Sequence, residues 1–482
     1  MKDFGCFIGG TWRPADNNEW IEVHDPADNT VIARIARGQA NDIDQAVSAA
    51  HLAQQKWSAR PPKDRAQILY VISRRIIDQA ETLSYIESQD TGKPLAQAKA
   101  DVIAAARFFE YYAGLADKIL GDSIPMGEEF IDFTVREPLG VTGQIVPWNY
   151  PLQIACRGIA PALATGNSVV VKPAELACLS IFSIVQICHD AGLPPGLLNI
   201  VPGYGQEAGV ALASHPNVNL VVFTGSVNTG TAVMEAAAKN IVPVVLELGG
   251  KSPNIVLQDA DLNTAVPSII KAAFPHSGQT CSAGSRVLVH SSVKDELLER
   301  LIKALDHLTI GHGLDDPNLG PVVSAAQRQK IENYIAIGKK EGAQVFTGGQ
   351  LIGNADFDIG HFVKPTILCA ASPQDRVARE EIFGPVLTIL SFNTLEEAAH
   401  LANNTEYGLV AGIWGRDIGN THWLAQKIKA GQVFINCYGA GGGVEIPFGG
   451  YRKSGFGREK GVDAIMSYTQ VKNICVRIDT SS

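Results

Sequence analysis

The sequence predicts an α/β fold built on a doubly wound parallel sheet, and three observations carry this prediction. The chain has 482 residues, enough for two or three domains. Between 141 and 251, short β-rich runs alternate with helical stretches, and the same alternation begins again past 252. Such a pattern is typical of parallel strands joined by crossover helices. We therefore expect a nucleotide-binding domain and a second α/β domain.

The amino-terminal part of the chain is predicted to be helical. Across 42–119, apolar residues are spaced by three and four, as at Ile68, Val71 and Ile72. The FIDFTVREP segment at 130–138 then alternates apolar and polar residues. We expect this segment to form an edge strand or one arm of a hairpin.

The strands of the nucleotide-binding domain are predicted from the runs between its helices. Helical stretches at 180–191 and 228–239 end at Gly, Asn and Pro residues, which terminate helices. The β-rich runs lie at 143–147, 168–172, 198–202, 220–224 and 242–246. In an open sheet of this kind, ligands bind at the carboxyl ends of the strands.

The second α/β domain shows the same alternation of β-rich runs and helical stretches. Strands are expected at 254–257, 286–290, 386–392 and 432–436, with a long helix at 293–308. The last segment, 467–478, is extended and carries apolar residues that need a partner surface.

The composition indicates an ordinary globular protein that acts on a small molecule. Apolar residues make up 46% and charged residues 18%, and 40 basic against 49 acidic side chains give a net charge of −9. No block of like charge suggests a nucleic-acid or membrane surface. The start of the chain does not resemble a signal peptide, and no run of about 18 apolar residues occurs. We expect a cytoplasmic protein without nucleic-acid or membrane partners.

The eight cysteines are too scattered for a small disulfide scaffold, and no CxxC pair suggests a metal site. Cys281 is the exception that could carry chemistry. It lies in GQTCSAGSR at 278–286, where small neighbours let a carbonyl carbon approach the sulfur. A helix amino end or a nearby cation would favour the attacking thiolate. The alternative is a loop cysteine without a catalytic role, and judged from this segment alone that alternative is favoured.

Glu247 is a candidate general base. It follows the apolar run 241–246, and a carboxylate at the end of a strand can reach a ligand cleft. If burial raises its pKa, such a group suits the activation of water or of a thiol. A turn residue beside two glycines is the more frequent interpretation.

Two segments could hold a nucleotide. Lys172 and Glu175 follow a predicted strand, so their charges project where a Glu can accept both hydroxyls of a ribose. The GSVNTG segment at 225–230 lies between a strand and a helix, where backbone N–H groups can face a phosphate. It is neither a P-loop nor a G-x-G-x-x-G fingerprint. Taken alone, the segment 172–175 is better explained as a solvated turn.

Seven motifs, taken in order, resemble those of the aldehyde dehydrogenase superfamily. They are PWNYP (147–151), KPAE (172–175), FTGS (223–226), ELGGK (247–251), GQTC (278–281), EEIFGPV (380–386) and PFGG (447–450). The resemblance extends from Phe7 to the carboxyl end. Its fold implies a Rossmann-type cofactor domain, an α/β catalytic domain and a small β oligomerisation arm.

The resemblance implies a covalent mechanism. In that family a cysteine thiolate attacks the aldehyde to give a thiohemiacetal, hydride passes to the nicotinamide, and water hydrolyses the thioester. By motif, Cys281 matches the nucleophile and Glu247 the general base. The Asn149 amide and the Cys281 backbone N–H match the oxyanion hole, whose donors meet charge that develops on oxygen.

The resemblance also implies NAD as the cofactor. Glu175 would repel a 2′-phosphate, so NADP is the less favoured alternative. Lys172 and Glu175 match the contacts to the adenosine ribose, Ser226 the contact to the pyrophosphate, and Glu381 and Phe383 those to the nicotinamide ribose. The full predicted set is Ile145, Val146, Pro147, Trp148, Lys172, Glu175, Phe223, Thr224, Gly225, Ser226, Gly230, Leu248, Gly249, Glu381 and Phe383.

The substrate is predicted from Tyr150, Arg157 and Phe448, together with a glycine-rich segment at 439–443. Arg157 resembles the Arg that succinic-semialdehyde dehydrogenases use on a carboxylate, although the second Arg of those relatives is here Pro275. Pairing of Arg157 with a structural acid is an equal alternative. The glycines predict either a wide mouth or a tight turn. We expect a bulky or carboxylate-bearing aldehyde.

The resemblance divides the chain as follows. The cofactor domain comprises 1–122 and 144–252, the catalytic domain 253–436, and the arm 123–143 and 465–482. The segment 437–464 forms the substrate mouth and returns to the cofactor domain. We expect a homodimer or homotetramer assembled through the arm. The rival functions are a coenzyme A-acylating aldehyde dehydrogenase, against which Glu247 argues, and a non-catalytic binding protein on the same fold.

Overall fold

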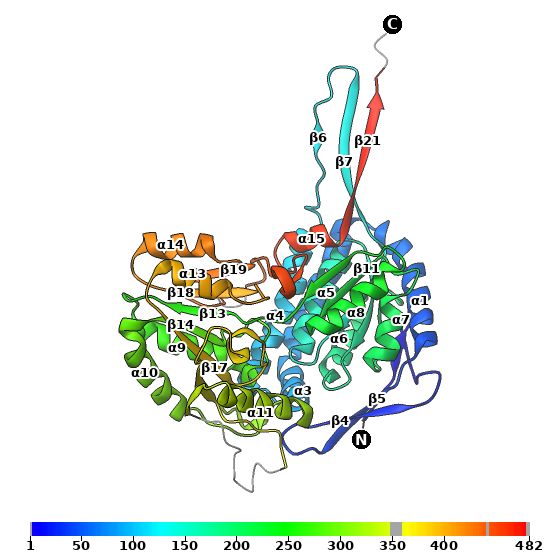
Figure 1. Ribbon diagram of the computed structural model, residues 1–482. Helices are drawn as coiled ribbons and strands as arrows, with labels where there is room; N and C mark the ends of the chain where they lie inside the picture. Colours follow the sequence, from blue (N-terminus) through cyan, green and yellow to red (C-terminus); the bar gives the residue numbers. More distant parts are fainter. Residues whose placement is uncertain (1, 348–358, 440–442, 479–482) are drawn as a thin grey trace.

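The computed structural model describes residues 2–347, 359–439 and 443–478 (Figure 1). Two large sheets, each covered by helices, lie side by side, and a narrow β arm projects away from them. The predicted α/β class is therefore confirmed. Residues 440–442 of the predicted mouth and 479–482 of the predicted arm lie outside the described residues.

The first sheet has five parallel strands at its centre. They are β8 (Val141–Val146), β9 (Ser168–Pro173), β10 (Leu198–Ile200), β11 (Leu220–Thr224) and β12 (Val244–Glu247), with antiparallel edges β20 (Gly455–Phe456), β2 (Cys6–Ile8) and β3 (Thr11–Arg13). The order is β20-β12-β11-β8-β9-β10-β2-β3. All five predicted strands are present: the run at 220–224 matches β11 at both ends, and the other four differ at one or both ends. The antiparallel edges were not predicted, because strands of two or three residues carry no readable alternation.

Helices cover both faces of this sheet. Their bounds are α1 (Ala40–Ser58), α2 (Pro62–Asp78), α3 (Ala80–Thr91), α4 (Leu95–Leu115), α5 (Pro151–Ala164), α6 (Leu179–Asp190), α7 (Val210–Ala213) and α8 (Val227–Ala238), with a π-helical turn at Gly205–Gly209. One apolar core joins the sheet to α1, α7 and α8, and the other joins it to α2–α6. This arrangement is the doubly wound one that the sequence predicts.

The second sheet includes the strand that directly follows the Cys281 loop. Its strands are β13 (Pro253–Val256), β14 (Arg286–His290), β15 (Gln344–Thr347), β16 (Thr366–Cys369), β17 (Val386–Phe392), β18 (Val410–Trp414) and β19 (Gln432–Ile435), in the order β15-β16-β17-β14-β13-β18-β19. All pairs are parallel except β15 with β16. The helices are α9 (Leu262–Ala273), α10 (Lys294–Asp306), α11 (Ala325–Lys340), α12 (Arg376–Arg379), α13 (Leu395–Asn403) and α14 (Ile418–Lys427).

A further three-stranded sheet was not predicted. It comprises β1 (Lys2–Phe4), β4 (Trp20–His24) and β5 (Val31–Ala36), in the order β1-β5-β4.

The arm joins two segments that are far apart in the sequence. It comprises β6 (Ser123–Ile124), β7 (Phe130–Pro138) and β21 (Thr469–Arg477), which follows the short helix α15 (Asp463–Ser467). β21 pairs antiparallel with β7 along its whole length. Figure 1 shows the arm extending well beyond the body of the molecule. The predicted strand at 130–138 is confirmed, and its partner is the apolar tail.

None of the helices in the described ranges combines the length and hydropathy needed to cross a bilayer.

Candidate active site

Cys281 lies in the loop that leads from α9 to β14. A 3-10 turn at Pro275–Gly278 precedes it, in which His276 and Ser277 adopt left-handed backbone angles with φ of 49° and 54°. The cysteine is half-buried, unbridged, and packs beside the apolar cluster of Leu409, Val410 and Phe448. Its loop therefore places the sulfur at a boundary between apolar side chains and an open cavity.

That cavity, of about 190 Å³, lies between the carboxyl ends of the first sheet and the second sheet. It brings together residues that the sequence separates by more than two hundred positions. The predicted residues that line it are Pro147, Trp148, Asn149, Thr224, Gly225, Ser226, Glu247, Gly249, Cys281, Glu381 and Phe383.

Two residues of the lining, Gln327 and Lys330, were not predicted. Both lie on α11, and the Gln327 side-chain amide donates to the Phe383 carbonyl oxygen at 2.6 Å. This bond supports Phe383, which has a left-handed φ of 61°. No sequence signal marks the two residues, since polar positions on an amphipathic helix ordinarily face solvent.

Glu247 ends β12 and is 1% exposed. Neither of its carboxylate oxygens has a hydrogen-bond partner among the described residues. Burial, and then the neighbouring Glu459 carboxylate, raise the pKa of Glu247 well above 4.5, against the opposing guanidinium of Arg157. A Cβ at Gly449 would lie 2.8 Å from Glu247 Oε1, so only glycine fits there. A buried, unpartnered carboxyl with a raised pKa is suited to proton transfer.

The surroundings of the Cys281 thiol favour its protonated form. Burial raises its pKa to about 12, and the Arg157 guanidinium, which lowers the pKa, does not offset the effect of burial. The nearby cation expected from the sequence is thus present but insufficient by itself. Formation of the thiolate requires a base, and Glu247 lines the same cavity.

Asn149 and Tyr150 connect the start of α5 to the Cys281 loop. The buried Asn149 amide donates to the Gln279 carbonyl oxygen at 3.0 Å. The Tyr150 phenol shares a 2.8 Å hydrogen bond with the Thr280 hydroxyl. Tyr150, predicted as a substrate contact, therefore contacts the loop that carries Cys281.

Arg157 is buried on α5 and pairs with the buried carboxylate of Glu459. Its guanidinium also donates to the Thr224 hydroxyl at 3.3 Å and lies 5.3 Å from the centre of the Phe448 ring. Glu459 is thus the structural acid expected if Arg157 pairs within the protein rather than with a substrate carboxylate.

The predicted nucleotide residues lie along the edge of the first sheet. Lys172, at the end of β9, lies 3.4 Å from the Glu175 carboxylate, and burial lowers the pKa of its ammonium. Gly225 and Ser226 form the amino end of α8, where Ser226 accepts from the Thr229 N–H. Ile145, Val146 and Phe223 lie within β8 and β11 beneath the site.

Glycines permit close packing around the far end of the cavity. A Cβ at Gly249 would overlap the Glu381 carboxylate, which accepts from the Gly250 N–H at 2.9 Å. A Cβ at Gly230 would lie 2.6 Å from the buried Leu248 side chain. Trp148 meets the Phe383 ring edge to face at 5.5 Å. A helix amino end, two carboxylates and an aromatic pair on one cavity fit a dinucleotide.

Comparisons with known proteins agree with this geometry. The family described as "Aldehyde dehydrogenase family" matches residues 12–474. Betaine aldehyde dehydrogenase of Bacillus subtilis is 41% identical over 475 residues, which cover 97% of this chain and 96% of that protein. The chain is also similar to a Burkholderia cenocepacia protein provisionally assigned as an aldehyde dehydrogenase, with 49% identity, a TM-score of 0.97, and 98% and 100% of the two chains covered. PnpE of Pseudomonas sp. WBC-3, solved in complex with nicotinamide adenine dinucleotide, is 40% identical with a TM-score of 0.98, covering 100% of this chain and 99% of that one.

Proposed function

The chain belongs to the aldehyde dehydrogenase family, and we propose that it oxidises an aldehyde to the carboxylic acid with NAD, through a thioester on Cys281. The observation that supports this proposal most directly is the pairing of Cys281 with Glu247. A protonated thiol and an unpartnered buried carboxyl line one cavity.

The chain's own residues account for the proton and oxygen chemistry. In its ionised form, Glu247 takes the thiol proton, and the sulfur attacks the carbonyl carbon to give a thiohemiacetal. The Asn149 amide nitrogen carries two hydrogens, of which one is used by Gln279, so the other can meet the oxyanion. Glu247 loses this proton to solvent before hydrolysis. It then takes a proton from water as the hydroxide attacks the thioester carbon. The carboxylic acid is released as the Cys281 thiolate leaves, and Glu247 returns the proton to the sulfur.

Lys172, Glu175, Gly225, Ser226 and Glu381 would hold the dinucleotide. When bound, NAD supplies the two-electron acceptor that turns the thiohemiacetal into the thioester. The half-buried Glu175 carboxylate favours NAD over NADP, because it would repel a 2′-phosphate.

The apolar wall beside the sulfur supports a bulky, uncharged aldehyde. Cys281 packs against Leu409, Val410 and Phe448, with Phe434 and Tyr438 beside them. Since Glu459 compensates the Arg157 charge, a substrate carboxylate would have to displace that internal pair. Of the two alternatives raised by the sequence, we propose the bulky aldehyde rather than the carboxylate-bearing one.

The proposal is tested by incubating the protein with NAD and aliphatic, aromatic and carboxylate-bearing aldehydes. We expect NADH and the free acid in equal amounts, and neither from Cys281→Ala. Cys475→Ser, a change at an exposed cysteine on the arm, is the matched control and should retain activity. The absence of NADH with every aldehyde, or product formation only when coenzyme A is added, would contradict the proposal.

We also propose that the arm assembles the chain into a homodimer or homotetramer. Ile131, Val471 and Val476 leave about half of their surfaces exposed, on strands that project from the body. A second copy of the chain would cover these residues.

A further inference from the structure

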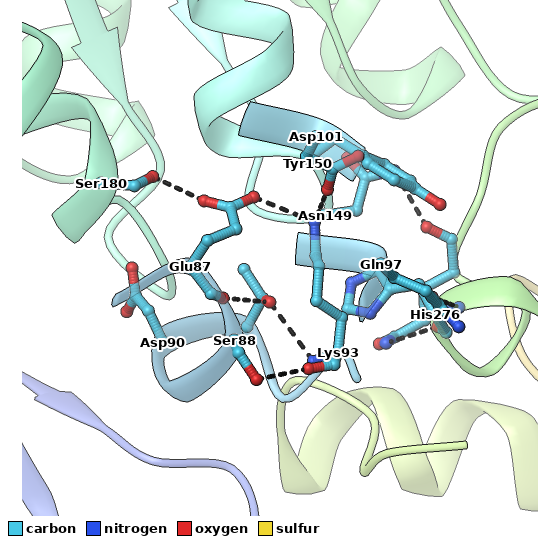
Figure 2. A network of polar contacts seen from close by, with 12 residues as sticks. Glu87, Ser88, Asp90, Lys93, Gln97, Asp101, Asn149, Tyr150, Ser180 and His276 are labelled. Atoms are coloured by element: carbon cyan, nitrogen blue, oxygen red, sulfur yellow. Dashed lines mark hydrogen bonds and ion pairs between the residues drawn. The ribbon is translucent and has the colours of Figure 1, made fainter. Parts of the chain in front are cut away.

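Lys93 is a buried cation held by two acids at the end of α3. Gly92 ends that helix with a left-handed φ of 79°, and Lys93 follows with an exposed fraction of 0%. Its ammonium lies 2.9 Å from Glu87 Oε1 and 2.6 Å from Asp101 Oδ2, as Figure 2 shows. The second Glu87 oxygen accepts from the Ser180 hydroxyl at 2.6 Å. Both oxygens of the Glu87 carboxylate therefore have a partner within the protein.

The open side of the cluster faces Tyr150. The Lys93 ammonium lies 4.2 Å from the centre of the Tyr150 ring, a cation–π distance. The phenol at the far end of that ring bonds the Thr280 hydroxyl at 2.8 Å, and Thr280 immediately precedes Cys281. Two consecutive contacts thus connect the buried ion cluster with Thr280, the residue next to the nucleophile.

The loop that receives this contact has an unfavourable backbone. His276 and Ser277 are left-handed although neither is glycine, and such conformations persist only where surrounding contacts determine them. The His276 N–H donates to the Gln97 side chain at 2.8 Å, and the Ser277 hydroxyl donates to the Gly320 carbonyl at 2.6 Å. The Tyr150 ring also meets the His276 ring edge to face at 5.6 Å. Tyr150 therefore contacts the loop at two places, at His276 and at Thr280.

We infer that Lys93 and Tyr150 are positioning residues, which fix the Cys281 sulfur through the bond from the Tyr150 phenol to the Thr280 hydroxyl. This inference rests on the proposed function of Cys281. The Glu87–Lys93–Asp101 cluster orients the ring, and the phenol holds the loop so that the sulfur stays at the cavity. In a merely structural role, the same contacts would stabilise the core without affecting the reactivity of the thiol.

Tyr150→Phe is the sharpest test, because it keeps the ring over the ammonium and removes only the bond to Thr280. Thr280→Val removes the same bond from the other side. The matched control is Tyr112→Phe, which removes a buried phenol that donates to the Gly461 carbonyl at 3.1 Å. The measurements are kcat, the KM for NAD, and the rate of Cys281 alkylation by iodoacetamide, followed by mass spectrometry of the peptide that contains it.

We expect Tyr150→Phe and Thr280→Val each to lower kcat by up to about tenfold, the effect of one hydrogen bond, with the KM for NAD unchanged. Tyr150→Phe and Thr280→Val should change the alkylation rate in the same direction. The double variant should show no further change, because each single variant already removes the one bond between the two side chains. Folded Lys93→Met protein should likewise show a lower kcat and a change of the alkylation rate in the same direction. Wild-type alkylation rates in Tyr150→Phe, or losses that multiply in the double variant, would overturn the inference.

The alkylation rate needs no aldehyde and no turnover, so it separates the two proposals. If the wild-type protein forms no NADH from any aldehyde, the proposed function fails and the alkylation comparison still reports on the position of the sulfur.

Discussion

The buried guanidinium of Arg157 and the buried carboxylate of Glu459 form an ion pair beside Glu247. The pair affects both carboxyl groups, because Arg157 lowers the pKa values of Glu247 and Glu459 while ionised Glu459 raises that of Glu247. An arginine that could have served a substrate carboxylate is thus part of the electrostatic surroundings of Glu247, the proposed general base.

Arg157→Gln should lower stability and activity without changing which aldehydes are preferred. Removing one partner of a buried pair leaves the other charge uncompensated and costs about 3–5 kcal/mol. We expect a lower midpoint of urea unfolding and a similar fractional loss of kcat/KM for an aliphatic aldehyde and for its ω-carboxylated counterpart.

The double variant Arg157→Gln with Glu459→Gln is the control, because it removes both charges. It should unfold at a higher urea concentration than Arg157→Gln alone. A loss confined to the carboxylated aldehyde in Arg157→Gln would instead assign Arg157 to substrate binding.

Glu247→Gln should lower the steady-state rate by about 10²–10⁴-fold, the usual contribution of a general base. Glu235→Gln, a change at an exposed Glu on α8, is the control and should leave the rate unchanged. Turnover by Glu247→Gln at the wild-type rate would remove Glu247 from the mechanism.

The pH dependence of kcat follows from the raised pKa of Glu247. Only the ionised form accepts a proton, so kcat should rise with pH through a value well above 4.5. The folded protein also holds this proton more tightly than the unfolded chain does. The resulting stabilisation is complete below pH 4.5 and declines as the pH rises to the folded-state value. Melting temperatures of wild type and Glu247→Gln across pH measure this difference, and parallel curves would contradict it.

Gly249→Ala should raise the KM for NAD. The new Cβ would overlap the Glu381 carboxylate and displace it from the cavity. Such overpacking costs about 1–3 kcal/mol, and a loss of binding energy of that size corresponds to an increase in KM of about 5- to 150-fold. Gly205→Ala is the control, since nothing lies within 4 Å of its added Cβ. Equal KM values for the two variants would show that Glu381 does not position the cofactor.

Residue types and local order predicted much of the site, because Glu247 and Cys281 lie in short motifs beside their own strands. The sequence did not predict that Lys330 and Gln327 line the cavity, because their position there depends on how α11 packs against the Phe383 segment. The ion-pair partner of Arg157 could not be predicted from the sequence either. Glu459 lies about 300 residues further along the chain, and only the fold brings it next to α5.

The parallel strands were predictable from the alternation of β-rich runs and helices, and the sheet edges were not. β20 has two residues and pairs with β12 only because the chain returns from the second sheet to the first. The pairing of β7 with β21 has the same local limit, since each strand shows its alternation but not its partner. Only the family resemblance placed the two segments in one arm.

The exposed apolar residues of the arm lead to a prediction about assembly. Val471→Lys combined with Ile131→Lys places two charges on surface that the proposed partner copy would cover, and burial of unpaired charges opposes association. We expect light scattering to show two or four chains for the wild type and a shift towards one chain for this variant. Gln470→Lys adds a charge at an exposed polar position of the same strand and should leave assembly intact. If the wild type scatters as a single chain at micromolar concentration, the arm does not serve this purpose.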